Sequence, residues 1–246
     1  MSHLYEHEAE LYDIAFDWDI SAEADWLVER IAGRSVLEPG CGSGRMLEAL
    51  ADRDLDVCGI DRSAPMVELA RSRLRGRGTL VVGDMTDFDL RRRFDGAVSP
   101  INTLLHLTPD ELARHLASVS RHAPRYLVQV GLLDPSSHEP FAGSHWEAER
   151  ADTRLKIDWI DDDVDFGRGV SRQRSRIEVL AGPRRGEVIE ELHVMTLWTP
   201  QTWGVAVASS PFDEVATYDG GRAGHWPRVG ADAVGGLLWH ELVTPL

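Results

Sequence analysis

The stretch Val36–Gly44, with the sequence VLEPGCGSG, constrains the fold more than any other part of the 246-residue chain. A short apolar run ends here in glycines at alternate positions, and a helical pattern follows at 44–52. This order predicts a buried strand, a tight loop and a helix. Glycine tolerates the positive φ of such a loop and lets a ligand approach the backbone closely. The helix that follows adds unpaired N–H groups at its first turn.

Strand and helix patterns alternate on both sides of this loop. Two helices have clear start signals, because Ser63 and Thr108 are good caps, each is followed within two residues by a proline, and Glu111 completes a capping box with Thr108. The alternation predicts a Rossmann-like, doubly wound α/β fold with a mostly parallel seven-stranded sheet and helices on both faces. Besides the strand before the loop, strands are expected at 55–61, 79–84, 94–100, 125–133, 211–219 and 236–243, and helices at 21–32, 44–52, 63–74, 108–122 and 199–209.

The pattern changes after residue 144. Three β-rich runs fill 153–197, and their alternation favours antiparallel strands with one wet face. We therefore predict an α/β core with N-terminal helices in 1–144, a β-rich insertion in 145–198, and completion of the core in 199–246. Because additions to a rigid scaffold commonly carry binding residues, we expect the insertion to be a lid over the substrate. The alternative is a surface for a homodimer.

Composition limits the partners. The formal net charge of −15 argues against a general nucleic-acid binder, which needs a basic surface. The run Arg91–Arg93 is read as a solvated surface turn. No apolar run has the roughly 18 residues of a membrane span. The polar, acidic start lacks the pattern of a signal peptide, and the two cysteines form no disulfide framework, so we expect a cytoplasmic protein without membrane partners.

Charge distinguishes the ligands that the glycine loop could bind. The spacing is GxGxG rather than GxGxxG, and Glu38 stands at the end of the strand. A carboxylate would repel the pyrophosphate of a dinucleotide, whereas it would attract the α-ammonium group of S-adenosylmethionine (SAM). Asp61 ends the second strand, where an acid commonly bonds ribose hydroxyls. The simpler alternatives are that Glu38 only caps the loop and that Asp61 only starts a helix beside Arg62.

These features resemble motif I of the class I SAM-dependent methyltransferases, and residues 34–133 follow the motif order of that family. The resemblance implies an enzyme that transfers a methyl group from SAM to an amine or hydroxyl of a small molecule by in-line displacement. It places the glycine loop at the methionine part, Asp61 at the ribose, Asp84 at the adenine amino group and Ser99 near the methyl. The full set of implied cofactor-binding residues is Tyr12, Glu38, Gly40, Cys41, Gly42, Asp61, Arg62, Met66, Asp84, Met85 and Ser99.

The acceptor side has weaker signals. The segment from Ser99 to Asn102 lacks the second proline and the aromatic residue of nucleic-acid and protein amide N-methyltransferases, and Asn102–Leu107 resembles the small-molecule branch. His106 and Asn102 are candidate catalytic residues, with His106 a general base or a substrate contact. The alternative is a structural histidine. A Tyr12-containing segment covers the cofactor in similar enzymes, and the insertion resembles that of N-methyltransferases acting on amino sugars or amino acids.

The remaining assignments concern the insertion. Candidate substrate residues are His145, Trp146, Trp159 and Trp198. No metal site is predicted, because HExxH and paired-cysteine patterns are absent from the sequence and the acidic run 161–165 is typical of a solvated turn. Two other functions stay open at this point: a nicotinamide-dependent oxidoreductase on a related fold, and a non-catalytic SAM-binding protein.

Overall fold

The computed structural model describes residues 3–136, 143–220 and 224–245. The chain divides into two compact units: Ile20–Ser137 with Trp198–Leu246, and Met1–Asp19 with His138–Leu197. This differs from our prediction, which joined the N-terminal helices to the α/β core. We call the first the α/β unit and the second the insertion unit. The end of the insertion also falls one residue earlier, so Trp198 belongs to the α/β unit.

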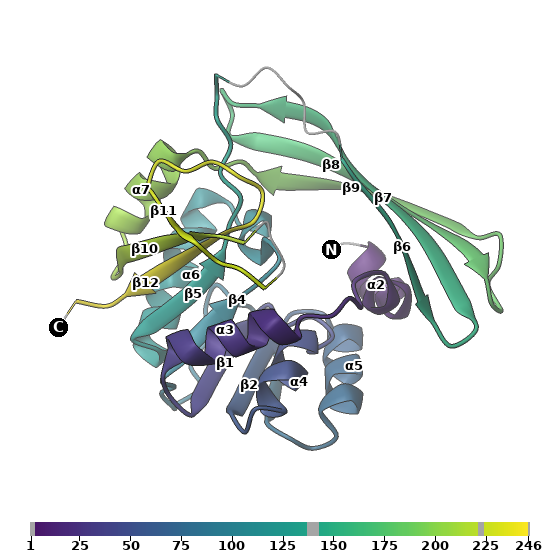
Figure 1. The fold of residues 1–246 in the computed structure, drawn as a ribbon, viewed down its shortest axis with the longest axis horizontal. Helices are drawn as coiled ribbons and strands as arrows, with labels where there is room; N and C mark the ends of the chain where they lie inside the picture. Colours follow the sequence, from purple (N-terminus) through teal and green to yellow (C-terminus); the bar gives the residue numbers. More distant parts are fainter. Residues whose placement is uncertain (1–2, 137–142, 221–223, 246) are drawn as a thin grey trace. The chain divides into compact units, whose positions relative to one another are not determined.

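The α/β unit contains one eight-stranded sheet in the order β11-β10-β12-β5-β4-β1-β2-β3 (Figure 1). Strands β1 to β5 run parallel, β12 is antiparallel to β5, and β10 is antiparallel to β12. The predicted Rossmann-like fold is confirmed, with an extra two-residue edge strand, β11, beyond the predicted seven. The bounds are β1 Ser35–Pro39, β2 Asp56–Asp61, β3 Thr79–Val82, β4 Gly96–Ser99, β5 Arg125–Gln129, β10 Asp213–Asp219, β11 Arg228–Val229 and β12 Leu238–Val243.

Helices cover both faces of this sheet because successive strand residues point to opposite sides. Val36 packs in a core cluster with α3 and α4, whereas the next residue, Leu37, packs in a cluster with α6 and α7. On β5, Leu127 belongs to the first cluster and its neighbour Tyr126 to the second. The bounds are α3 Ser21–Ile31, α4 Arg45–Ala51, α5 Ala64–Leu74, the 3-10 helix η1 Thr103–His106, α6 Pro109–His122 and α7 Pro200–Ala208.

The predicted helix starts are confirmed in atomic detail. The Ser63 side chain accepts a hydrogen bond from the Met66 N–H at 3.3 Å. Thr108 and Glu111 form the reciprocal capping box at the start of α6. These N-caps fix the residues at which α5 and α6 begin.

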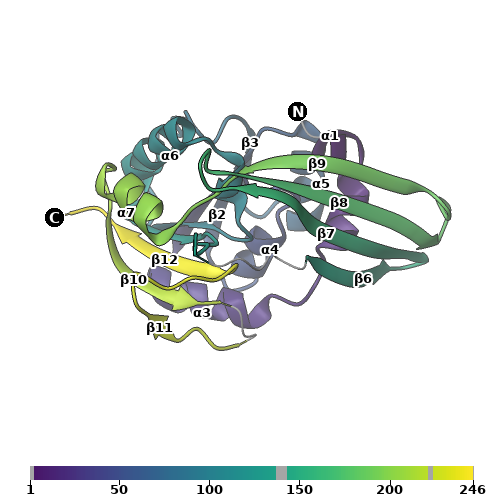
Figure 2. The same ribbon diagram turned by 90° about the horizontal axis from the view of Figure 1, so that it is seen from above.

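The insertion unit contains a four-stranded antiparallel sheet in the order β6-β7-β8-β9 (Figure 2). The bounds are β6 Ser144–Arg150, β7 Thr153–Asp165, β8 Val170–Ala181 and β9 Val188–Thr196. Our reading of three strands missed β6, whose sequence SHWEAER has few apolar residues. The acidic run was also wrongly read as a turn, since residues 161–165 belong to β7. Cross-strand arginines compensate these charges, with Arg174 Nε 2.9 Å from Asp162 Oδ2 and Arg172 Nη1 2.8 Å from Asp163 Oδ2.

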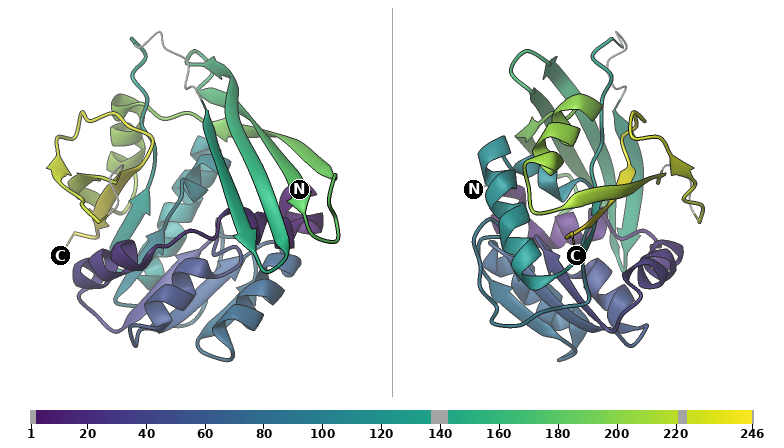
Figure 3. Two further views of the ribbon diagram at one scale, coloured as in Figure 1. Left: turned by 45° about the vertical axis from the view of Figure 1, so that its right-hand side comes forward. Right: turned by 90° about the vertical axis from the view of Figure 1, so that its left-hand side faces the viewer.

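Helices α1 (His3–His7) and α2 (Ala9–Ala15) pack on one face of this antiparallel sheet (Figure 3). Leu4, Leu11 and Ala15 are buried against aliphatic side chains of the strands, which are Leu155, Ile157, Ile177 and Val179. A half-exposed guanidinium adds an ion pair, because Arg150 Nη1 lies 2.6 Å from Asp13 Oδ2. The apolar faces of two short helices need a partner to be stable, and the sheet supplies it. Within the described residues, no helix is both long and apolar enough to cross a membrane.

Candidate functional site

The glycine loop lies at the carboxyl end of β1, between the ends of β2 and β4. The N–H groups of Gly40 and Cys41 donate to the carbonyl oxygen of Ile60 at 2.7 and 3.0 Å, which ties the loop to β2. Gly40, Gly42 and Gly44 have φ of 77°, 52° and 77°, a region that side chains disfavour. This edge is where ligands bind in open parallel sheets.

The space around the loop explains two of these glycines. A Cβ atom on Gly40 would lie 2.6 Å from Thr103 Cγ2 and 3.1 Å from Met85 Sδ. A Cβ atom on Gly42 would have no described heavy atom within 4 Å. Gly40 is thus required by close packing, whereas the loop around Gly42 leaves room for a ligand.

Glu38 is buried, with 3% of its surface exposed. Burial raises the pKa of its carboxyl group well above the usual range; the positive charge of Arg45 opposes this rise and the negative charge of Asp61 adds to it. Its Oε2 atom has no hydrogen-bond partner among the described residues. A buried carboxylate oxygen without a partner is costly, so the position favours a cation. The residues therefore fit the ammonium group of SAM and disfavour the pyrophosphate of a nicotinamide cofactor.

The carboxylate of Asp61 shapes the loop. Its Oδ2 accepts a hydrogen bond from the Gly42 N–H at 2.8 Å, and its Oδ1 accepts one from the Ser63 N–H at 2.9 Å. Asp61 therefore fixes both the glycine loop and the start of α5. The spacing in the sequence indicated the ribose role but not this second role.

The third loop follows β3. Asp84 Oδ1 accepts a hydrogen bond from the Thr86 N–H at 2.8 Å, and this bond is the main reason that the pKa of Asp84 is lowered. The positive charge of Arg62 acts in the same direction. Met85 reaches the glycine loop, as its distance to the Gly40 position shows. Of the other predicted residues in this unit, Cys41 and Met66 are buried and Arg62 is exposed.

The residues after β4 have different surroundings from one another. Ser99 is buried, and its Oγ contacts the Pro39 carbonyl at 3.1 Å and the Tyr126 hydroxyl at 2.7 Å. Asn102 Nδ2 donates to the Gly236 carbonyl at 2.9 Å, and its Oδ1 accepts from the Gly131 N–H at 2.8 Å. The amide of Asn102 thus joins three loops, which gives it a structural role. His106 is exposed at the end of η1.

Two of the four predicted substrate residues lie together in the insertion unit, because the ring centroids of Trp146 and Trp159 are 5.6 and 5.7 Å from that of Phe16. His145 and Trp146 lie on β6 and point to opposite faces of the sheet. His145 Nδ1 is 2.7 Å from Asp158 Oδ1, whereas Trp146 Nε1 donates to the Ala15 carbonyl at 2.6 Å. Trp159 stacks on His193 with ring centroids 4.7 Å apart.

Trp198, which we expected on a strand of the insertion, is buried in the core of the α/β unit. Tyr12 lies on α2 in the insertion unit and stacks on Phe16 at 4.4 Å.

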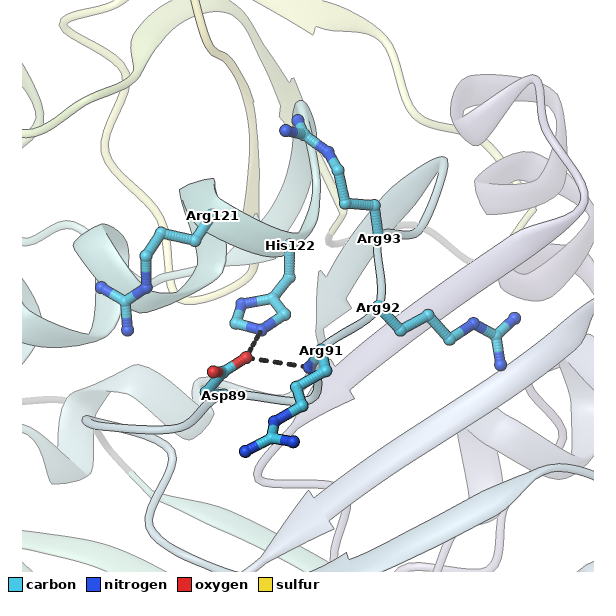
Figure 4. A pocket seen from close by; sticks show the side chains of 6 residues that line it. All are labelled: Asp89, Arg91, Arg92, Arg93, Arg121 and His122. Atoms are coloured by element: carbon cyan, nitrogen blue, oxygen red, sulfur yellow. Dashed lines mark hydrogen bonds and ion pairs between the residues drawn. The ribbon is translucent and has the colours of Figure 1, made fainter.

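A basic pocket of about 520 Å³ lies at the opposite end of the parallel strands from the glycine loop, next to the segment that precedes β4 (Figure 4). Arg91 to Arg93 are exposed, as expected for a surface turn. The long side chains of Arg92, Arg93 and Arg121 point in different directions, and the Asp89 carboxylate lies between Arg91 and His122 (Figure 4). The guanidinium groups do not converge, so we assign no anion site here. In the part of the chain that the structure describes, no group of three or more His, Cys, Asp or Glu side chains is placed to hold a metal ion.

Comparisons with known proteins agree with the chemistry of the loop. A family model described as a methyltransferase domain matches residues 36–124. The chain is 30% identical over 248 residues to the dTDP-3-amino-3,4,6-trideoxy-alpha-D-glucopyranose N,N-dimethyltransferase of Streptomyces venezuelae, and the match covers 92% of this chain and 98% of the relative. The chain belongs to the class I SAM-dependent methyltransferases. It is therefore an enzyme that uses SAM, and the predicted methyl transfer to an amine or hydroxyl of a small molecule is confirmed. The nicotinamide-dependent and non-catalytic alternatives are set aside.

Solved structures show that the methyltransferase fold extends over the whole chain. The crystal structure of Streptomyces venezuelae DesVI matches with a TM-score of 0.79 and 22% identity, covering 97% of this chain and 98% of that one. SAM-bound CalS10, an amino pentose methyltransferase from Micromonospora echinaspora, matches with a TM-score of 0.73 and 21% identity, and covers 98% of each chain. Both matches include the insertion.

Proposed function

We propose that this methyltransferase N-methylates the amino group of a nucleotide-linked amino sugar. The observation that carries the proposal is the length of the match to the Streptomyces venezuelae dimethyltransferase, which includes the insertion as well as the SAM-binding core. A second relative, the dTDP-3-amino-3,6-dideoxy-alpha-D-glucopyranose N,N-dimethyltransferase of Streptomyces fradiae, is 28% identical over 79% of this chain. A match restricted to the core would support SAM chemistry but would leave the acceptor open.

The geometry of the α/β unit suggests which residues hold SAM. Glu38 would pair with the α-ammonium group, and the open side of the loop at Gly42 would receive the methionine part. Asp61 would bond the ribose hydroxyls through its carboxylate oxygens, each of which can accept more than one hydrogen bond. The exposed Asp84 and the half-buried Met85 would border the adenine. These assignments extend to Tyr12, Cys41, Arg62, Met66 and Ser99 by family resemblance.

The reaction asks little of the protein beyond positioning. SAM supplies a methyl group on an activated leaving group, so the residues of the site need to align the acceptor nitrogen and exclude water. A protonated amine must lose a proton before it can attack. His106 follows β4 at the ligand-binding edge and is exposed, so we propose that it accepts this proton.

Incubation of the purified protein with SAM and a dTDP-linked amino sugar tests the proposal. We expect mass spectrometry to show one or two added methyl groups. The matched control is the same nucleotide sugar with a hydroxyl in place of the amine. Methylation of the control alone, or of neither compound while SAM still binds, would contradict the amino-sugar assignment.

We also propose that the insertion unit binds the acceptor. A deletion test must also remove the N-terminal helices, which pack on the antiparallel sheet. Removal of 143–197 alone would expose Leu4, Leu11 and Ala15 on these helices. A variant that lacks both Met1–Asp19 and 143–197 should still bind S-adenosylhomocysteine and should lose methyl transfer. Full activity of this variant would exclude the insertion from the reaction.

The alternative role of the insertion as a dimer surface stays a prediction. Strand β9 is an edge of its sheet, and Val188, Leu192 and Val194 are exposed on one face of it. Light scattering of wild type and a Leu192→Arg, Val194→Arg variant would detect such a dimer. Identical monomer masses for both proteins would exclude it.

A further inference from the structure

A chain of buried polar groups crosses the face of the sheet that α6 covers. The Nδ1 of His115 lies 2.8 Å from the Met85 carbonyl oxygen, and its Nε2 lies 2.8 Å from the Tyr126 hydroxyl. The Tyr126 hydroxyl is 2.7 Å from Ser99 Oγ, which is 3.1 Å from the Pro39 carbonyl oxygen. His115, Tyr126 and Ser99 are each 0% exposed. Four contacts thus connect two backbone carbonyls through three side chains.

This series of four hydrogen bonds has only three hydrogen atoms available to it. Both ends are carbonyl oxygens, which only accept hydrogen bonds, so each of the four contacts needs a hydrogen from the three side chains. Tyr126 and Ser99 supply one hydrogen each, and a neutral imidazole supplies a third. Burial lowers the pKa of His115 to about 4, so the ring is neutral at physiological pH. One contact therefore lacks its hydrogen at any moment. When both hydroxyls donate toward His115, the Pro39 carbonyl is the group left without one.

The two ends of the chain meet at the glycine loop. Pro39 directly precedes Gly40, and Met85 Sδ lies 3.1 Å from the Cβ position of that glycine. Helix α6 contacts the same segment once more, because Ser118 Oγ donates to the Thr86 carbonyl at 3.1 Å. This second contact is outside the chain of four. It provides a matched control on the same helix.

We propose that Ser99, Tyr126 and His115 are positioning residues of the SAM site, which couple the carbonyl of Pro39, directly before the glycine loop, to the carbonyl of Met85. This inference rests on the SAM site assigned above. A ligand that fixes the glycine loop favours the arrangements in which Ser99 donates to Pro39, and the missing hydrogen must then lie closer to Met85. Because the arrangement at one carbonyl limits the arrangement at the other, the methionine and adenosine parts of the ligand bind cooperatively.

The Tyr126→Phe variant tests the coupling, since it removes the central hydroxyl and leaves both ends in place. Without that hydroxyl, Ser99 can donate to Pro39 while His115 donates to Met85, so the two ends are no longer coupled. We expect calorimetry to show about tenfold weaker binding of S-adenosylhomocysteine, which is within the usual range for the loss of a coupling between two binding regions. Binding of 5′-methylthioadenosine, which has no amino-acid part, should change much less. The Ser118→Ala control should bind both ligands as the wild type does. A purely structural role would weaken both ligands equally or neither.

Two isosteres of His115 sharpen the test. His115→Asn keeps a donor near the Nδ1 position and loses the contact with Tyr126, whereas His115→Gln keeps a group near Nε2. If the four hydrogen bonds act together, both variants bind S-adenosylhomocysteine more weakly than the wild type does. Wild-type affinity in His115→Asn would show that the Met85 contact alone matters and would overturn the coupling.

The outcomes also separate this inference from the proposed site. Unchanged affinity for S-adenosylhomocysteine in Tyr126→Phe, or an equal loss for both ligands, would overturn the inference and leave the SAM site intact. If Tyr126→Phe does not fold, Ser99→Ala removes the contacts with Tyr126 and Pro39 and leaves those of His115, and the same comparison of ligands applies to it. Failure of the wild type to bind S-adenosylhomocysteine would instead overturn the proposed site.

Discussion

The two units of the molecule differ in whether their carboxylates are paired. On the face of the antiparallel sheet that α1 and α2 do not cover, carboxylates pair with arginines, as Asp163 does with Arg172 and Asp162 with Arg174. At the end of β1, by contrast, the buried Glu38 leaves one oxygen without a partner. Pairing exposed charges costs little and contributes little, whereas an unpaired buried charge is expensive. The difference supports our proposal that Glu38 binds the ammonium group of SAM, whereas these two ion pairs only join β7 to β8.

Gly40→Val is the most damaging change that we predict for the proposed SAM site. A branched side chain must adopt φ of 77° and lies within 2.6 Å of Thr103 Cγ2. Backbone strain of about 1–3 kcal/mol and overpacking of about 1–3 kcal/mol both fall on the loop, so we expect no measurable SAM binding by calorimetry.

A matched control is Gly76→Val, because Gly76 has φ of 83° and its Cβ position has no described heavy atom within 4 Å. This variant has the backbone strain without the packing clash, and it should bind SAM normally. Normal binding by Gly40→Val would place the ligand elsewhere.

Glu38→Gln should weaken SAM binding by about 1–3 kcal/mol, the usual contribution of a hydrogen bond to a charged group. The pH dependence sharpens this prediction. The pKa of Glu38 is raised in the free protein, and a bound ammonium group would lower it again. Binding therefore releases a proton at pH values between the pKa of the complex and that of the free protein, and affinity rises with pH through that interval. Titrations in buffers of different ionisation enthalpy measure the proton release.

The same substitution has the opposite effect on stability. Because the folded pKa of Glu38 lies above its ordinary value of 4.5, ionisation of this group destabilises the free protein increasingly as pH rises from that value through the folded pKa. Glu38→Gln should raise the melting temperature of the free protein at high pH and leave it unchanged below pH 4.5. Proton release that persists in the variant would exclude Glu38 as its source.

The contrast also explains what could be predicted from sequence. The loop Gly40–Gly44 can adopt few backbone conformations, because alternate glycines after an apolar run favour one tight turn. The caps at Ser63 and Thr108 are also predictable, because each acts within three residues of sequence. Strand β6 was missed for another reason: its sequence SHWEAER has few apolar residues, although it pairs with β7 in a local hairpin. The contacts of His115 with Tyr126 and of Tyr126 with Ser99 could not be predicted, because they join α6, β5 and β4, which are separate in the sequence.

Asp61→Asn should have a smaller effect than Glu38→Gln. An amide presents one acceptor instead of two, so either the Gly42 or the Ser63 N–H loses its partner, and the loop loses part of its fixed shape. We expect about tenfold weaker binding of S-adenosylhomocysteine. Asp56→Asn is the control, because Asp56 lies exposed at the other end of β2 and pairs with Arg92. Equal affinities for the two variants would remove Asp61 from the site.

Arg174→Gln tests the other side of the comparison and should have the smallest effect. The guanidinium of Arg174 and the carboxylate of Asp162 are both accessible to solvent, with 53% and 30% of the side chains exposed. Water and salt screen such a pair, and holding two long side chains in place offsets most of the attraction. We therefore expect no measurable change in melting temperature, in its salt dependence or in S-adenosylhomocysteine binding. A clear loss of methyl transfer to the acceptor at unchanged stability would mean that this face of the sheet also binds substrate. The contrast between Glu38, which we propose binds a ligand, and charges that only join neighbouring strands would then no longer hold.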